Sequence, residues 1–314
     1  MRHPDRWRET IDLATLGFRN IDILEVMGYP HAGNDVFHVR VSFQGAETTA
    51  FIKVERQDGA DIANEVSILS SLSFPYCPKI LDFSLDQPRY IVTEEVPGER
   101  LSLIFANNPD TNIKCFLSKQ GVVLSELHAL HIHCDPVKDR RFFHIPSHGY
   151  CFEHGFEAEH EFLITNKPVN PQRCFVHGDF HYANILWRES EISCVLDYEL
   201  SGIGIREFDM AWSVVLRPGQ KFLTSMDDVE SFLDGYDCRC DLRSIGHART
   251  RSGATLSPLD YRESFSRASF YYYFIMIAVH FSPLGDDEYK QHIKRLVWEA
   301  VRLHDRLICS AQTS

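Results

Sequence analysis

The spacing of apolar residues changes along the chain and divides it into two regions near residue 97. In the first region, residues 36–43 alternate apolar and polar positions, residues 50–54 are rich in β-formers, and residues 21–26 form a short apolar run. Runs of this kind, separated by Gly and Asn, are typical of strands joined by short turns. The pattern therefore predicts an antiparallel meander.

One helix is expected within this strand-rich region. Asp61 can accept hydrogen bonds from the first free amides of a helix, and apolar residues then recur at helical spacing over 62–72 until Pro75 interrupts them. A further β-rich run over 90–96 leads into a Pro-Gly turn at 97–98. We interpret this turn as the boundary between two lobes.

Helical spacing dominates beyond the turn. Apolar residues over 116–130 follow one helical face, and the last third of the chain has similar long patterns. Two short apolar pieces, 174–176 and 192–196, run directly into acidic residues, as strands that deliver carboxylates to a cleft do. The sequence thus predicts an α+β protein, with a β-rich lobe over residues 1–96 and a mostly helical lobe over 97–314.

Composition and charge exclude several classes of protein. The 314-residue chain is 44% hydrophobic and 24% charged, as ordinary globular proteins are. Its net charge of −12 offers no positive field for nucleic acid or anionic lipid. The longest apolar run, residues 270–281, is too short to cross a bilayer, and the N-terminus is too charged for a signal peptide. We expect a cytoplasmic protein with neither nucleic acid nor membrane as a partner, and no pattern defines its oligomeric state.

Cysteine and histidine patterns do not predict a metal site. The nine cysteines include no CxxC pair, so reduced thiols are expected rather than a disulfide framework or a zinc ribbon. Cys238 and Cys240 form the one close pair, without a second pair to complete a tetrahedral set. Of His128, His131 and His133, only the first two share a helical face, and we interpret them as core or capping residues.

The functional signal is concentrated in residues 177–187, His-Gly-Asp-Phe-His-Tyr-Ala-Asn-Ile-Leu-Trp. Asn184 follows Asp179 by five residues, which is the spacing of a kinase catalytic loop. In such a loop the Asp accepts the proton of the acceptor hydroxyl and the Asn holds magnesium. A second strand presents Asp197, and oxygen ligands from Asn184 and Asp197 suit Mg²⁺, which also keeps water and phosphate oxygens. These residues predict phosphoryl transfer from a metal-bound nucleotide.

The arrangement resembles the aminoglycoside phosphotransferase and choline kinase-like group of small-molecule kinases. That group's signature is HGDxxxxN, a strand ending in Ile/Leu-Asp, a Gly, and an Asp in a DLA-like segment. Here the pieces are residues 177–184, 196–197, Gly204 and 209–211, and with the first lobe the resemblance covers about residues 20–215. It implies a two-lobed protein-kinase-like fold that uses ATP or GTP with Mg²⁺. Asp179 would be the catalytic base, and Asn184 and Asp197 the metal ligands.

The resemblance also implies roles in the first lobe. Lys53 lies on a predicted strand, on the face opposite Ile52 and Val54, and would reach the α and β phosphates. Its partner would be Glu65 on the following helix. The main chain at Glu95 and Val96 would meet the adenine base.

Two departures from kinase patterns affect this interpretation. The loop over residues 28–35 takes the phosphate-covering position, with Gly33 and Asn34 as candidate nucleotide contacts, but it lacks G-x-G-x-x-G. Asn34 and Asp35 stand where a Walker A motif requires Lys and Ser/Thr, so a P-loop is excluded. After Asp197, Tyr-Glu replaces the Phe-Gly of protein kinases and no A-P-E follows. A small-molecule acceptor is therefore favoured over a protein.

The identity of the acceptor is left open by the sequence. Acidic residues are concentrated in residues 151–161 and 227–237, and the candidate acceptor contacts are Glu157, Glu161, Asp227 and Asp228. Such clusters suit a cationic aminoglycoside, with antibiotic resistance as the function, but they equally suit a solvated helix face. Choline, ethanolamine, homoserine, a sugar and a macrolide are alternative acceptors. A catalytically inactive ATP-binding module is the non-enzyme alternative.

Overall fold

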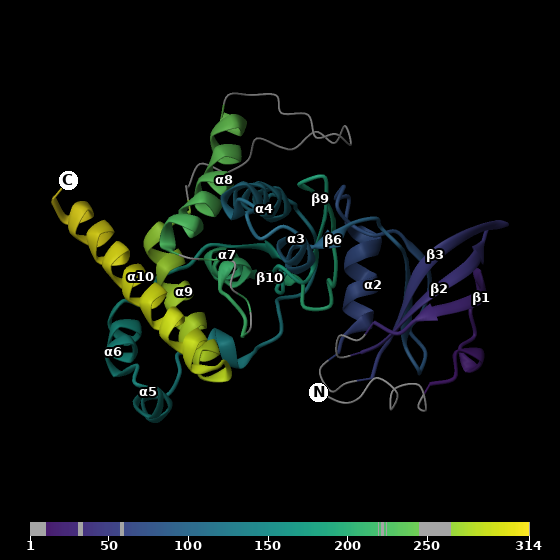
Figure 1. The fold of residues 1–314 in the computed structure, drawn as a ribbon, viewed down its shortest axis with the longest axis horizontal. Coiled ribbons are helices and arrows are strands. Elements are labelled where there is room, and N and C mark those ends of the chain that lie inside the picture. The colour runs from purple at the N-terminus through teal and green to yellow at the C-terminus, as the bar shows by residue number, and fades with distance from the viewer. Residues whose placement is uncertain are drawn as a thin grey trace. The chain divides into compact units, whose positions relative to one another are not determined.

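The computed structural model describes residues 11–313 except 31–33, 57–59, 219, 221–222, 224 and 245–264. The chain divides into two compact units, and Figure 1 labels most of their helices and several of their strands. The first unit comprises Met1–Gly98 and Ser193–Ser201, and the second comprises Glu99–Ile192 and Gly202–Ser314. The first stretch of this unit ends at Gly98, two residues after the boundary that the sequence predicts at residue 96. Residues 193–201, expected in the second lobe, belong instead to the first unit.

The first unit is built on a five-stranded sheet. Its order is β1-β2-β3-β5-β4, and every neighbouring pair is antiparallel, so the predicted meander is present. The elements of this unit are η1 (Leu13–Thr15), β1 (Ile21–Gly28), β2 (Asp35–Phe43), β3 (Ala46–Val54), α2 (Ile62–Ser71), β4 (Ile80–Ser84) and β5 (Tyr90–Glu94).

The alternation of residues in β3 places Lys53 on the helix-covered face of the sheet. Lys53 pairs with Ile91 of β5, so the two side chains lie on one face. Ile91 packs against Ile62 and Val66 of α2. The neighbouring Ile52 is fully buried on the other face, where it contributes about 1.5–3 kcal/mol to folding. Lys53 therefore points toward α2.

The second unit is mostly helical, and β10 pairs with β7, and β6 with β8, in antiparallel fashion. Strand β9 (Glu191–Val195) begins in this unit and continues into the first. The remaining elements are β6 (Glu99–Arg100), α3 (Leu101–Asn107), α4 (Ile113–His128), η2 (Arg141–Phe143), α5 (His148–His154), α6 (Glu157–Thr165), β7 (Arg173–Val176), β8 (Ile185–Arg188), β10 (Gly202–Ile205), α7 (Arg206–Val214), α8 (Met226–Ser244), α9 (Arg267–Phe281), η3 (Ser282–Leu284) and α10 (Asp287–Thr313).

Close helix packing forms the core of the second unit. Helices α4 and α8 approach so closely that a Cβ atom at Gly121 would collide with the carbonyl oxygen of Phe232. Helix α9 is apolar on nearly all sides and packs against α7 and α10, so the aromatic run over residues 270–274 is core. No helix in the described residues has both the length and the apolar character needed to span a membrane.

Candidate active site

The loop that follows β7 is held by a buried aspartate of α7. Asp209 accepts hydrogen bonds from the backbone amides of His177 (3.1 Å) and Gly178 (2.9 Å). Gly178 has a φ of 80°, a conformation that favours glycine. His128 Nε2 lies 3.1 Å from Asp209 Oδ2, and His128 is buried, as expected for a core histidine. Asp209 therefore fixes the start of the predicted catalytic loop.

Three side chains orient the carboxylate of Asp179. Trp212 Nε1 donates to Oδ1 at 2.8 Å, Asn184 Nδ2 donates to Oδ2 at 3.0 Å, and His181 Nε2 lies 3.5 Å from Oδ1. Burial alone would raise the pKa of Asp179, but His181, the charge of Arg217 and the Trp212 hydrogen bond outweigh it and hold the pKa well below its usual range. Asp179 is therefore a fixed, ionised carboxylate, as a catalytic base must be.

Asn184 is oriented so that its side-chain oxygen stays available. Its Nδ2 atom donates to both the backbone oxygen and the Oδ2 atom of Asp179, each at 3.0 Å. An amide whose nitrogen is fixed in this way presents its oxygen elsewhere. This geometry fits the metal-ligand role that the sequence predicts for Asn184.

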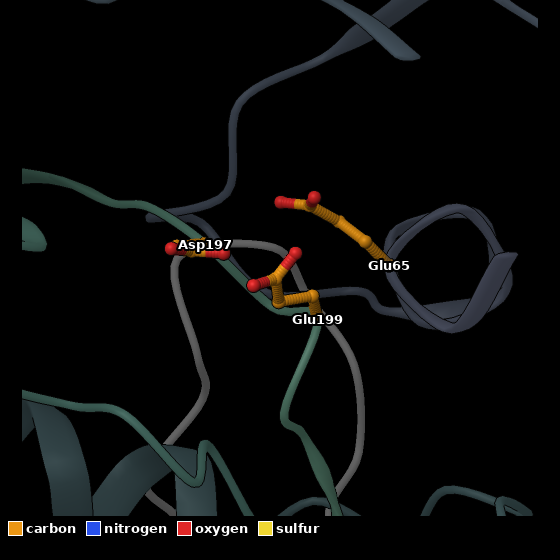
Figure 2. A group of neighbouring side chains, drawn as sticks. All are labelled: Glu65, Asp197 and Glu199. Atoms are coloured by element: carbon orange, nitrogen blue, oxygen red, sulfur yellow. The ribbon is translucent and has the colours of Figure 1, made fainter. Parts of the chain in front are cut away.

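In the first unit, one lysine lies among three carboxylates. Figure 2 shows the side chains that carry them, Glu65, Asp197 and Glu199. Lys53 Nζ lies 2.9 Å from Glu65, as expected, and also 2.7 Å from Asp197 and 3.1 Å from Glu199. The part played by Glu199 was not predicted. Its one sequence signal was a second acidic residue two positions after Asp197.

The charges of this cluster favour a cation. Burial is the main cause that raises the pKa of Glu65 and of Glu199, although Lys53 opposes it. Burial would lower the pKa of Lys53, but the three carboxylates outweigh it and raise the pKa. Each of Glu65, Asp197 and Glu199 has one carboxylate oxygen that lies within 4.8 Å of an oxygen of the other two. A single ammonium does not balance three carboxylates, and Mg²⁺ prefers such oxygen ligands, so the residues fit this ion.

Hydrogen bonds to residues that are distant in sequence hold the segment around Glu199 on the first unit. The amide of Val195 donates to the Tyr76 carbonyl at 2.7 Å. Asn64 Nδ2 donates to the carbonyl oxygens of Glu199 (3.0 Å) and Ser201 (2.9 Å). These bonds are the physical reason that residues 193–201 belong to the first unit.

The predicted phosphate-covering residues are only partly described. Gly33 lies outside the described residues. Asn34 is buried, and its Nδ2 atom donates to Glu199 Oε2 at 3.1 Å while its Oδ1 atom accepts from the amide of Arg56 at 3.3 Å. The side chain of Asn34 thus positions Glu199.

The predicted adenine contact lies just after β5. The amide of Glu95 donates to the Thr49 carbonyl at 3.0 Å, and its carboxylate lies 3.0 Å from His38 Nε2. Burial tends to raise the pKa of Glu95, but hydrogen bonds from Thr49 and His38 outweigh it and lower the pKa. The amide of Glu95 is therefore used within the sheet, which leaves its carbonyl and the amide of Val96 as candidate adenine contacts.

The four candidate acceptor carboxylates differ in exposure. Glu157 and Glu161 are exposed on α6, and Asp227 is exposed on α8. Asp228 is buried and accepts from the amide of Ser225 at 3.4 Å. Asp228 thus caps the start of α8, a structural task that sequence patterning alone did not distinguish from substrate binding.

An arginine neutralises the later part of the second acidic stretch. Arg267 of α9 hydrogen-bonds to Asp234 and Asp237, each at 3.1 Å, and also to Glu230. Their negative charge is therefore partly satisfied within the protein rather than left for an amine ligand.

Comparison with known proteins identifies related sequences and folds. A model of the phosphotransferase enzyme family matches residues 32–239, more than half of the chain. No curated protein matches the chain. A solved structure of a thermostable mutant of aminoglycoside phosphotransferase APH(4)-Ia, in ternary complex with AMP-PNP and hygromycin B, is 13% identical. It covers 93% of this chain and 96% of its own, with a TM-score of 0.52.

A second solved structure has a similar fold. Plasmodium vivax ethanolamine kinase is 12% identical and covers 90% of this chain and 82% of its own, with a TM-score of 0.51. At these identities the likeness concerns the fold, and it confirms the predicted α+β, protein-kinase-like class.

Proposed function

Because the chain belongs to the phosphotransferase enzyme family, we propose that it transfers the γ-phosphoryl group of ATP or GTP to a hydroxyl of a small molecule. The observation that carries this proposal is the orientation of the Asp179 carboxylate, which accepts hydrogen bonds from Trp212 and Asn184. In the reaction, the acceptor oxygen forms a bond to the γ-phosphorus, the bond from that phosphorus to the β-phosphate oxygen breaks, and the nucleoside diphosphate leaves. The hydroxyl proton passes to Asp179.

The carboxylate cluster supports nucleotide binding. Lys53, oriented by the buried Glu65, is the cation that would contact the α and β phosphates. In the first unit, Asp197 and Glu199 are proposed to hold Mg²⁺, and Glu199 is an addition to the set that the sequence suggested. Asn184 of the second unit stays the other ligand that the family resemblance implies. Mg²⁺ bound there would neutralise negative charge on the nucleotide phosphates. The carbonyl of Glu95 and the amide of Val96 are proposed for the adenine base.

A direct transfer assay tests this function. ATP or GTP carrying a labelled γ-phosphate is incubated with the protein, Mg²⁺ and a panel of cationic, neutral and anionic alcohols. Transfer of label to an acceptor is expected, with free nucleoside diphosphate as the second product. Magnesium-dependent nucleotide binding without transfer to any acceptor would instead favour an inactive nucleotide-binding module.

A further inference from the structure

Two arginines stack on the tryptophan that orients Asp179. The guanidinium carbon of Arg140 lies 4.9 Å from the centre of the Trp212 ring, and that of Arg217 lies 4.3 Å from it. The same indole donates to Asp179 Oδ1 at 2.8 Å. One aromatic ring therefore brings two cations close to the proposed base.

Most hydrogen-bond donors of these arginines have no partner in the described part of the chain. Arg140 donates through Nη2 to the Gly178 carbonyl at 2.7 Å. Arg217 donates to the carbonyl oxygens of Val215 (2.5 Å) and Trp212 (3.2 Å). A guanidinium has about five N–H donors, so both retain a free edge. Neither forms an ion pair with a described carboxylate, in contrast to Arg267.

The nearby aspartates do not use these donors. Asp179 is bonded to Trp212 and Asn184, and Asp209 is bonded to two backbone amides and to His128. Both carboxylates are therefore satisfied by other groups. Asp179 attracts both arginines electrostatically, and Asp209 attracts Arg140.

Both guanidinium groups are partly buried, and none of their nitrogen atoms is both fully buried and without a hydrogen-bond partner. Burial lowers the pKa of Arg140, although Asp179 and Asp209 oppose it. Burial likewise lowers the pKa of Arg217 to about 10, against the attraction of Asp179 and with the added repulsion of Arg140. Two like charges in a partly desolvated site favour a bound anion, because it would satisfy the spare donors and relieve the repulsion.

Aromatic packing holds both guanidinium groups in place. Arg140 also stacks on Phe143, with 4.8 Å to the ring centre, and Arg217 stacks on Phe281 at 4.5 Å. A planar fork fixed in this way loses little freedom on binding, and its geometry matches a carboxylate or a phosphate. The site is thus organised for an anion before one arrives.

We propose that Arg140 and Arg217 bind an anionic group of the acceptor, a carboxylate or a phosphate ester, while the acceptor hydroxyl meets Asp179. The acceptor is then a hydroxy acid or a phosphorylated alcohol rather than a polyamine. This inference rests on the proposed function, because it assumes that Asp179 receives the proton of the acceptor. It assigns no role in acceptor binding to the exposed carboxylates of α6 and α8.

Acceptors that differ in charge, with glycerol as the neutral counterpart of glycerate and glycerol 3-phosphate, test the proposal. Glycerate and glycerol 3-phosphate are compared with glycerol, ethanolamine and kanamycin in the transfer assay. We expect kcat/KM for an anionic acceptor to exceed that of glycerol by at least about a hundredfold, as two charge-assisted contacts allow. Preferred turnover of glycerol, ethanolamine or kanamycin would overturn the anion site and leave the proposed function standing.

Substitution of each arginine tests whether these two residues cause the preference for an anionic acceptor. Arg140→Gln and Arg217→Gln should each raise KM for the anionic acceptor about tenfold to a hundredfold while changing KM for the nucleotide little. Arg141→Gln is the matched control, because Arg141 is exposed and stacks on Phe142 with 4.6 Å to the ring centre. An equal loss in the control, or none in either variant, would contradict the assignment.

A binding measurement on the wild-type protein depends neither on turnover nor on the folding of variants. The indole signal of Trp212 and the arginine side-chain signals are followed by NMR during titration with malonate, inorganic phosphate, glycerol or ethanolamine. Saturable shifts with malonate or phosphate alone support the site and show which anion it prefers, even if no acceptor turns over and the proposed function fails. Absence of such shifts with both anions would overturn it.

Discussion

The indole nitrogen of Trp212 lies 2.8 Å from Oδ1 of Asp179, so a residue of α7 orients the proposed base in the loop after β7. An indole N–H is a donor only, and it cannot take the proton that the carboxylate must accept. The contact therefore holds Asp179 in its ionised form without competing for its chemistry.

Replacing the base should abolish transfer and spare nucleotide binding. We expect Asp179→Asn to reduce kcat by at least about a hundredfold, since general-base catalysis typically contributes 10²–10⁴-fold. Its affinity for Mg²⁺-ATP, measured by calorimetry, should stay within about threefold of wild type. Asp287→Asn, at an exposed position of α10, is the control and should retain full activity. A fully active Asp179→Asn protein would show that the base is another group.

The pH dependence should reflect the low pKa of Asp179. Burial opposes the shift, but His181 and Arg217 lower the pKa, so the carboxylate persists at every pH above that depressed value. Activity is then lost through this group only as the pH falls through the depressed pKa. We therefore expect the profile of kcat/KM to show no acid limb from Asp179 near or above about 3.9, the usual pKa of Asp. The prediction is wrong if the profile has an acid limb in this pH range and Asp179→Asn shifts that limb with the same acceptor, because the limb would then belong to Asp179.

Removing the indole donor should raise the pKa of Asp179 from its depressed value. Trp212→Phe keeps an aromatic ring but loses the hydrogen bond to Asp179, so the pKa of the base rises and kcat falls about tenfold. Trp298→Phe is the matched control, because Trp298 is exposed on α10. The comparison requires kcat across the pH range for both variants. Identical profiles for the two would assign Trp212 to packing alone.

The carboxylate cluster predicts coupled binding of metal and nucleotide. Asp197→Ala and Glu199→Gln should each weaken Mg²⁺-dependent binding of ATP at least about tenfold, because the ion loses an oxygen ligand. Calorimetry with and without Mg²⁺ separates this loss from metal-independent binding. Glu189→Gln, in an exposed turn after β8, should bind like wild type. Unchanged metal dependence in Glu199→Gln would remove Glu199 from the ligand set.

The packing of α4 on α8 predicts a stability effect away from the site. Gly121→Ala places a methyl group against the carbonyl oxygen of Phe232, and we expect it to destabilise the protein by about 1–3 kcal/mol. Gly149→Ala is the control, because no atom lies within 4 Å of the added methyl group and α5 gains helix propensity. Denaturant unfolding of both variants measures the difference. Equal stabilities would mean that the two helices move apart readily.

The parts of this protein that depend on near neighbours in the chain could be read from its sequence. The alternation over β2 and β3 depends on successive side chains pointing to opposite faces, so it predicts the sheet and the position of Lys53. The five-residue spacing of Asp179 and Asn184 is likewise local, and the two side chains meet within one loop. The helix after Asp61 was likewise predicted from its apolar spacing, whereas the pairing of Glu65 with Lys53 was implied by the family resemblance.

Groups that meet only through packing were decided by the tertiary structure. Trp212 lies in α7, Arg217 follows this helix, and Arg140 lies in a loop far earlier in the chain. Their spacing in the sequence does not predict that they gather around one carboxylate. Glu199 reaches Lys53 because hydrogen bonds attach its segment to the first unit. Conversely, acidic residues that look alike in sequence are separated by structure into solvated, capping and ion-paired groups. The physical reason is that local periodicity sets how a segment folds, whereas the charge and contacts of a side chain depend on what distant segments place beside it.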